Sequence, residues 1–168
     1  MDKVLTVYFD DKSLFNKFIS VLENNKKITD VNLENKLILI DSNEKCVISC
    51  EHLLIICGKN TKYLPYILNN NDVTVILNSS CRLILTENQA KNYKFITCGF
   101  SSKDSVTISS ITTDKSLISI QRGFFNFIGE KIEPMELISE CNYKDCENML
   151  EIVTAQLYCF GKNILELL

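Results

Sequence analysis

Short apolar runs alternate with polar turns through the first hundred residues. The runs predict strands over residues 3–9, 36–40, 46–49, 52–58, 72–78 and 94–100. HLLIICG is an unbroken apolar run from Leu53 to Cys57, and DVTVILN has a similar β-branched and apolar centre, which is typical of parallel strands that are buried on both faces. The pattern therefore predicts a mainly parallel sheet rather than a set of hairpins.

Helical spacing appears between these strands. Apolar residues follow the first strand at intervals of 1, 3, 1 and 3 from Leu14 to Leu22, with Asp10 or Asp11 as the N-cap and Asn24 near the end. Residues 60–68 predict a second helix despite an internal proline, and residues 86–93 predict one or two further helical turns. Strands that alternate with helices predict an α/β fold with helices flanking the sheet.

The pattern changes after Phe100. Residues 104–111 and 116–122 alternate apolar and polar positions around a polar turn, which predicts a β-hairpin with one solvated face. Residues 124–138 predict a turn and another strand. Apolar residues from Cys146 to Phe160 predict a C-terminal helix that begins near Asn142 and ends at Gly161. We expect one domain over 1–168, made of an alternating part (1–100), a β-rich extension (101–141) and the helical end (142–168).

Charge and cysteine usage exclude several classes of function. The net charge of -3 and the scattered basic residues give no electrostatic case for binding nucleic acid or an anionic membrane. No apolar stretch is long enough to span a bilayer, and the acidic N-terminus does not resemble a signal peptide, so we expect a cytoplasmic protein. The eight cysteines lie partly inside apolar runs, which favours reduced, buried thiols over disulfides.

Two glycine-containing turns are candidate phosphate sites. GFSSKDS, which starts at Gly99, has one glycine and precedes a strand, so it lacks the second glycine and the helix of a phosphate-binding loop. Gly58, Lys59, Asn60 and Thr61 follow a buried strand and precede an expected helix. This position favours a plain strand-to-helix turn, with a small anion site as the alternative.

Metal binding and cysteine catalysis find weaker support. Cys46, Cys50 and His52 lie close together in the sequence, as do Cys141 and Cys146, but neither set has the paired spacing of a structural zinc site. We expect no metal and no cofactor. A cysteine nucleophile would be Cys98 or Cys57 with His52, the lone histidine, as its base; packed thiols are the alternative. Glu130, Glu133 and Glu136 are candidates for acid–base chemistry, but acids that alternate near a turn favour a solvated face. Arg122, which with Arg82 makes up the arginines of the chain, is a candidate for binding an anion.

Residues 72–111 carry one resemblance to a known family. A strand delivers Asn78, a short helix follows, a second strand ends at Gly99, and the chain leaves through Asp104-Ser105-Val106 into β structure. This order resembles the end of the central domain of the Mur ligases, which join amino acids to UDP-linked muramyl precursors. The family's phosphate-binding loop and its magnesium-binding Glu and His positions are absent, and serines follow Asn78. The resemblance therefore implies a shortened relative without ligase activity.

Three functional hypotheses follow. The first is a non-catalytic binding or assembly protein, a homodimer through the apolar 116–128 region. The second is a binding module for a nucleotide or UDP-sugar, a small anionic ligand that Gly58 to Thr61, Asn78 and Gly99 would hold at the carboxyl ends of strands. The third is a small cysteine-dependent enzyme that uses Cys98 or Cys57. No complete catalytic group is present in the sequence, so we expect a protein that binds rather than an enzyme.

Overall fold

The computed structural model describes residues 4–24, 36–41, 47–68, 72–112, 115–139 and 148–162. The chain forms two compact units, Met1–Phe95 and Ile96–Leu168. Each unit is described by itself.

The first unit is built on a parallel sheet. Its strands are β1 (Val4–Phe9), β2 (Lys36–Asp41), β4 (His52–Cys57) and β6 (Asp72–Asn78), in the spatial order β6-β4-β1-β2. Each adjacent pair is parallel, with Leu5 opposite Leu37 on one side and His52 on the other. The interior of β4 is buried at every position after His52. The predicted parallel sheet with strands buried on both faces is therefore confirmed.

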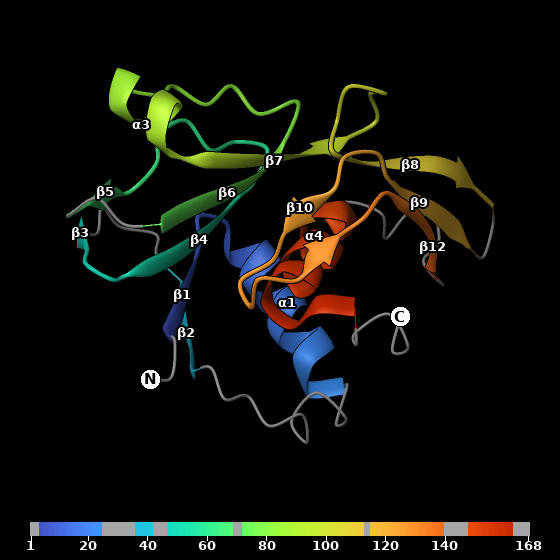
Figure 1. Ribbon diagram of the computed structural model, residues 1–168, viewed down its shortest axis with the longest axis horizontal. Coiled ribbons are helices and arrows are strands. Elements are labelled where there is room, and N and C mark those ends of the chain that lie inside the picture. Colours follow the sequence, from blue (N-terminus) through green and yellow to red (C-terminus); the bar gives the residue numbers. More distant parts are fainter. Residues whose placement is uncertain are drawn as a thin grey trace. The chain divides into compact units, whose positions relative to one another are not determined.

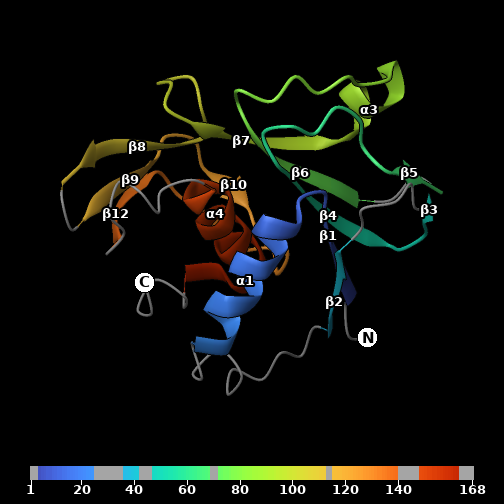
Figure 2. The ribbon, with the colours of Figure 1, turned by 180° about the vertical axis from the view of Figure 1, so that it is seen from behind.

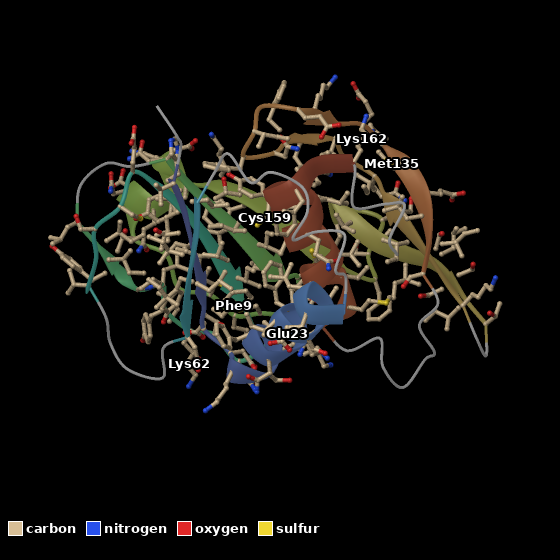
Figure 3. All side chains as sticks on the ribbon, turned by 90° about the horizontal axis from the view of Figure 1, so that it is seen from below. Phe9, Glu23, Lys62, Met135, Cys159 and Lys162 are labelled. Atoms are coloured by element: carbon tan, nitrogen blue, oxygen red, sulfur yellow. The ribbon has the colours of Figure 1, made fainter. Side chains whose placement is uncertain are left out.

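Helix α1 (Lys12–Asn24) covers one face of this sheet (Figure 2). Asp11 caps the helix, because its Oδ1 accepts hydrogen bonds from the backbone N–H groups of Ser13 at 2.7 Å and Leu14 at 3.4 Å. Phe9, at the end of β1, packs its ring against Phe18, with the ring centres 5.2 Å apart (Figure 3). The helix predicted after the first strand is therefore confirmed.

The opposite face of the sheet is covered without a long helix. Side chains from this face of β1, β4 and β6, among them Tyr8, Leu53 and Val73, form a buried cluster against which Leu64 and Ile67 pack. Ile48 of β3 (Val47–Ile48) belongs to this cluster, and Ile67 belongs to β5 (Tyr66–Ile67). Tyr93 and Phe95, which follow the short helix α3 (Glu87–Asn92), also pack against it. Figure 1 shows α3, β3 and β5 at the same end of the first unit.

The helix predicted over residues 60–68 is wrong. This segment is a turn followed by extended backbone, and Tyr66–Ile67 pairs in parallel with Val47–Ile48 as a two-stranded sheet. Pro65 explains the difference, because proline disfavours helical backbone at the residue before it and has no N–H to donate. The helix predicted around residues 86–93 is confirmed as α3, which begins with a capping box between Thr86 and Gln89.

The second unit mixes parallel and antiparallel strands. Its order is β12 (Met135–Ser139), β9 (Ser116–Ile120), β8 (Val106–Ile111) and β7 (Lys94–Gly99), of which the part from Ile96 onward belongs to this unit. β7 and β8 are parallel, whereas β8, β9 and β12 are antiparallel, so the predicted hairpin is confirmed. Its expected solvated face is wrong for β9, where only Leu117 is less than fully buried. The serines of β9 are small enough to lie under α4, where the Ser116 hydroxyl contacts the Met149 sulfur at 3.9 Å.

Helix α4 (Met149–Phe160) has eleven buried residues and packs on β8. It ends at Gly161, as the sequence predicts, whereas its expected N-cap Asn142 lies outside the described residues. The short strands β10 (Phe124–Phe125) and β11 (Lys131–Ile132) form an antiparallel hairpin. This hairpin is hydrogen-bonded to the C-terminal end of α4, because the Glu130 carboxylate accepts a 3.1 Å hydrogen bond from the Lys162 backbone N–H. Figure 3 labels Lys162 beside this hairpin. Within the described ranges, no helix is both long and apolar enough to cross a membrane.

Candidate functional site

Three loops of the first unit meet at the carboxyl ends of its strands. Asp10 follows β1, Gly58 follows β4, and Asn78 ends β6. The Thr61 hydroxyl donates a 2.7 Å hydrogen bond to Oδ2 of Asp10, and the Thr61 backbone N–H donates to the Gly58 carbonyl at 3.2 Å. Thr61 is 4% exposed, so this bond is largely protected from water. The loop after β4 is thereby fixed to the loop after β1.

The loop after β6 joins the same network. The Cys81 thiol donates to the Thr61 carbonyl over 2.9 Å, and the Cys81 backbone N–H donates to the Asn78 carbonyl over 2.9 Å. Oδ1 of Asn78 accepts from both the backbone N–H and the hydroxyl of Ser80. Thr61 and Asn78, two of the predicted ligand-binding residues, thus lie in one hydrogen-bond network. Asp10 and Cys81 also belong to this network and were not among the predicted site residues. No spacing signal could have found them, because the contacts join different loops.

These contacts do not favour an anion at this edge. The carboxylates of Asp10 and Asp11 lie beside the turn, and a Cβ added at Gly58 would lie 2.8 Å from Oδ2 of Asp11. Gly58 is therefore required for a close approach to an acid rather than to a phosphate. Lys59 and Asn60 are exposed. The ligand role of Gly58 to Thr61 and Asn78 stays a prediction.

The turn after Gly99 belongs to the second unit and is filled by its own side chains. Oδ2 of the buried Asp104 accepts a 3.0 Å hydrogen bond from the Ser101 backbone N–H, and the Ser101 hydroxyl accepts from Lys103. The Ser105 backbone N–H donates to the Thr97 hydroxyl over 3.0 Å. Each of these backbone N–H groups already has an acceptor within the unit, the Asp104 carboxylate for Ser101 and a hydroxyl for Lys103 and Ser105, so this geometry leaves none for a bound phosphate. The turn therefore resembles a strand exit, not a phosphate cradle.

A groove opens beside the fixed loops of the first unit. Its lining comes from residues 63–66 of the loop after β4 and from residues 84–86 and Gln89 of the loop and helix after β6, and its volume is about 290 Å³. We call it the Tyr63–Tyr66 groove. The two walls are hydrogen-bonded to each other, because the Ile84 backbone N–H donates to the Lys62 carbonyl over 2.8 Å. Tyr63 and Ile84 also form a parallel β-bridge.

Large apolar side chains are exposed along this groove and next to it. Tyr63 is 66% exposed and Tyr66 is 67% exposed, and Ile84 on the facing wall is 57% exposed. Val47, which is opposite Tyr66 in the β3–β5 pair, is 61% exposed. Such a concentration of apolar surface marks an interaction site more often than a solvated face. The groove could not be expected from a helix over residues 60–68, because Tyr63 and Tyr66 lie on extended backbone instead; Pro65 between the two tyrosines was the signal for it.

The cysteines do not have the properties of nucleophiles. Burial raises the pKa of Cys98 well above that of a free thiol, and the negative charge of Glu151 raises it further. Burial also raises the pKa of Cys57, with smaller contributions from Cys81 and Asp10. Both residues are completely buried. Because the thiolate is the reactive form, these environments argue against the cysteine-enzyme hypothesis.

His52 begins β4, at the opposite end of this strand from Cys57. Its Nδ1 is 3.8 Å from Oδ2 of Asp72, and Lys94 Nζ is 2.6 Å from Oδ1 of the same carboxylate. His52, Lys94 and Asp72 therefore form a partly exposed cluster on the surface, and ion pairs of this kind contribute little to the free energy of folding. Among the residues that the structure describes, no cluster of His, Cys, Asp and Glu could hold a metal ion. Cys46, Cys141 and Cys146 lie outside those residues.

Comparison of the chain with protein-family models, curated proteins and solved structures gives no match. Residues 72–111 do form the order that the resemblance to the Mur ligases implies, namely β6, α3, β7 and β8. Many α/β domains share that order. The resemblance therefore stays a prediction.

Proposed function

We propose that this chain is a non-catalytic binding protein and that the Tyr63–Tyr66 groove binds an extended, uncharged segment of a partner protein. The observation that carries the proposal is the exposure of Tyr63, Tyr66 and Ile84 around one groove. Tyrosine supplies a large contact area at low entropic cost and is enriched among the residues that dominate binding energy.

The charge of the groove supports an uncharged occupant. Its lining is made of tyrosine, leucine, isoleucine, proline, threonine and glutamine side chains, and no described lining residue is ionised at neutral pH. A nucleotide or UDP-sugar would bring phosphates into this lining with no cation to pair them. The Thr86 hydroxyl oxygen and the Gln89 side-chain oxygen accept the capping-box hydrogen bonds of α3, and their hydrogens can be donated to the backbone carbonyls of a peptide.

The shape of the surface supports a protein segment over a small molecule. Drug-sized ligands prefer enclosed cavities that bury most of their surface. Here the apolar side chains continue beyond the groove, to Val47 and to Leu68, which is 44% exposed. An extended segment can contact the groove and this flanking surface together.

The hydrogen-bond network below the groove supports binding without rearrangement. Thr61 and Cys81 hold the starts of the two loops together, and the Lys62–Ile84 hydrogen bond holds their walls. Loops fixed before binding lose less conformational entropy when a ligand arrives, which increases affinity.

Selection from a display library of random peptides, followed by binding titrations with the purified chain, tests the proposal. We expect enriched peptides to be rich in apolar and aromatic residues and low in charge. Tyr66→Ala should raise the dissociation constant by at least about tenfold. Phe125→Ala is the matched control, because Phe125 is 66% exposed in the other unit, and it should leave the affinity unchanged. Acidic peptides, or peptides that bind the Tyr66→Ala variant equally well, would overturn the proposal.

A further inference from the structure

The polar side chains of the Tyr63–Tyr66 groove favour donating hydrogen bonds over accepting them. Oγ1 of Thr86 accepts the Gln89 backbone N–H over 3.3 Å, and Oε1 of Gln89 accepts the Thr86 backbone N–H over 2.9 Å. This capping box uses the acceptor oxygen of each side chain and leaves the hydroxyl hydrogen of Thr86 and the amide hydrogens of Gln89. Both residues line the groove, so an occupant that offers acceptors is favoured.

The N–H groups of the occupant set a second constraint. Apart from Thr86 and Gln89, the described lining residues are apolar or tyrosine, and the tyrosine hydroxyls are the side-chain groups among them that can accept. A backbone N–H that enters such a lining without an acceptor gives up its hydrogen bond to water, which lowers affinity. Proline has a carbonyl but no N–H. A run of prolines therefore meets both constraints, which an ordinary extended peptide does not.

The spacing of the two exposed tyrosines matches the repeat of such a run. Tyr63 and Tyr66 both line the groove and lie three residues apart. Three residues of extended chain span at most about 10 Å, and one turn of a polyproline II helix rises by about 9 Å. The two rings can therefore contact successive turns of one ligand. Grooves lined by aromatic side chains are the surfaces on which proline-rich segments dock.

We infer, on the basis of the proposed function, that the segment bound by the Tyr63–Tyr66 groove is an uncharged, proline-rich chain in the polyproline II conformation. The tyrosine rings pack on its pyrrolidine rings, and Thr86 and Gln89 donate to its carbonyls. Polyproline II has no internal hydrogen bonds, so these carbonyls are available, and it is formed before binding, so less conformational entropy is lost. No described lining residue is ionised, so charges beside the prolines add nothing.

Titration of the full, isotope-labelled chain with decaproline, followed by nuclear magnetic resonance, tests the inference. The peptide is acetylated and amidated, so that it carries no terminal charge. A comparison peptide replaces every second proline with alanine, which restores the N–H group at those positions. We expect the comparison peptide to bind at least about tenfold more weakly than decaproline. Tyr66→Ala should weaken the binding of decaproline by a similar factor.

A pair of variants on α3 tests the donors. Gln89→Glu keeps an oxygen that can accept the Thr86 N–H, because glutamate is also a capping-box residue, but it removes the amide hydrogens. Asn88→Asp adds the same charge at the next position, outside the lining, and keeps Oδ1 as the acceptor for Asn92. We expect Gln89→Glu to weaken decaproline binding about tenfold and Asn88→Asp to leave it unchanged, with circular dichroism showing that both are folded.

The result for decaproline is compared with that for the peptides selected by display. If selected peptides without proline bind the groove and decaproline does not, the inference is wrong and the proposed function stands. If neither kind of peptide binds, or if both bind Tyr66→Ala as well as the wild type, the inference and the proposed function are both wrong. Equal affinity for decaproline and its alanine-containing counterpart, or an unchanged affinity in Gln89→Glu, also overturns the inference.

Discussion

Thr61 donates its hydroxyl hydrogen to the carboxylate of Asp10, a residue 51 positions earlier in the chain, over 2.7 Å. This bond joins the loop after β4 to the loop after β1. The Thr61 carbonyl in turn accepts the thiol of Cys81 from the loop after β6. One residue therefore links three strand ends and sets the position from which the Tyr63–Tyr66 groove begins.

Replacing Thr61 tests that role. Thr61→Val keeps the shape of the side chain but leaves Asp10 without its donor, so we expect it to lower the free energy of unfolding by about 1–3 kcal/mol. Thr61→Ser keeps the hydroxyl and should cost less. Chemical denaturation of the three proteins measures both effects. Equal stability of the Val and Ser variants would show that the bond does not hold the loops.

Gly161 and Gly129 both have a backbone conformation that favours glycine. Both have a positive φ, at 71° and 85°, but a Cβ at Gly161 would overlap Oε2 of Glu130, whereas a Cβ at Gly129 would meet nothing within 4 Å. Gly129→Ala should cost about 1–2 kcal/mol from its left-handed backbone alone. Gly161→Ala should cost more, because a φ of 71° with a ψ of −161° is open essentially to glycine alone and because the new Cβ displaces the carboxylate that accepts the Lys162 N–H. Thermal unfolding measures the loss of stability in each variant. A smaller loss in Gly161→Ala than in Gly129→Ala would contradict the importance of the Glu130 contact at the end of α4.

Buried thiols predict a loss of stability at alkaline pH. Burial alone raises the pKa of Cys159, so its folded value lies above its unfolded value of about 8.5. The stability that this thiol contributes is complete below that unfolded pKa and falls as the pH rises through it, by about 1.4 kcal/mol per pH unit. Figure 3 labels Cys159 on α4.

The contribution of Cys159 to the fall of the free energy of unfolding with pH is measured by comparing the wild type with a variant that lacks this thiol. Denaturation of the wild type and of Cys159→Ala between neutral pH and pH of about 10 should give a shallower decline for the variant. Cys159→Ala has its own packing cost, but that cost does not depend on pH. Parallel declines would mean that the Cys159 thiol ionises as readily in the folded chain as in the unfolded one.

Alkylation rates test the cysteine-enzyme hypothesis directly. Cys57, Cys98 and Cys159 are buried and their pKa values are raised, so iodoacetamide should modify them slowly at neutral pH. Cys50 and Cys81 are partly exposed and should react first. Mass spectrometry after timed alkylation assigns each site. Rapid modification of Cys57 or Cys98 in the folded chain would restore that hypothesis.

The parallel sheet could be predicted because its sequence signal is local. In HLLIICG every interior position is apolar, and β4 is buried at each of them. The cap of α1 was predictable for the same reason, since Asp11 and the apolar positions from Leu14 onward lie within a few turns of one another.

The site could not be predicted because its contacts are not local. The Thr61–Asp10 bond and the Tyr63–Ile84 bridge join residues that are distant in the sequence. Residues 60–68 have helical spacing, but pairing of Tyr66 with Val47 and the proline before it fix them in extended backbone. Tertiary pairing overrode local propensity there, and it moved two tyrosines from an expected helix face to an exposed groove.

One nuclear magnetic resonance titration tests the proposed function most directly. The labelled chain is titrated with a peptide enriched by display, and the amide shifts are followed residue by residue. We predict that the largest shifts fall on residues 63–66, residues 84–86 and Gln89, and that they disappear in Tyr66→Ala but persist in Phe125→Ala. Shifts that fall instead on residues 58–61, Asn78 or Gly99, with the groove unaffected, would contradict the account.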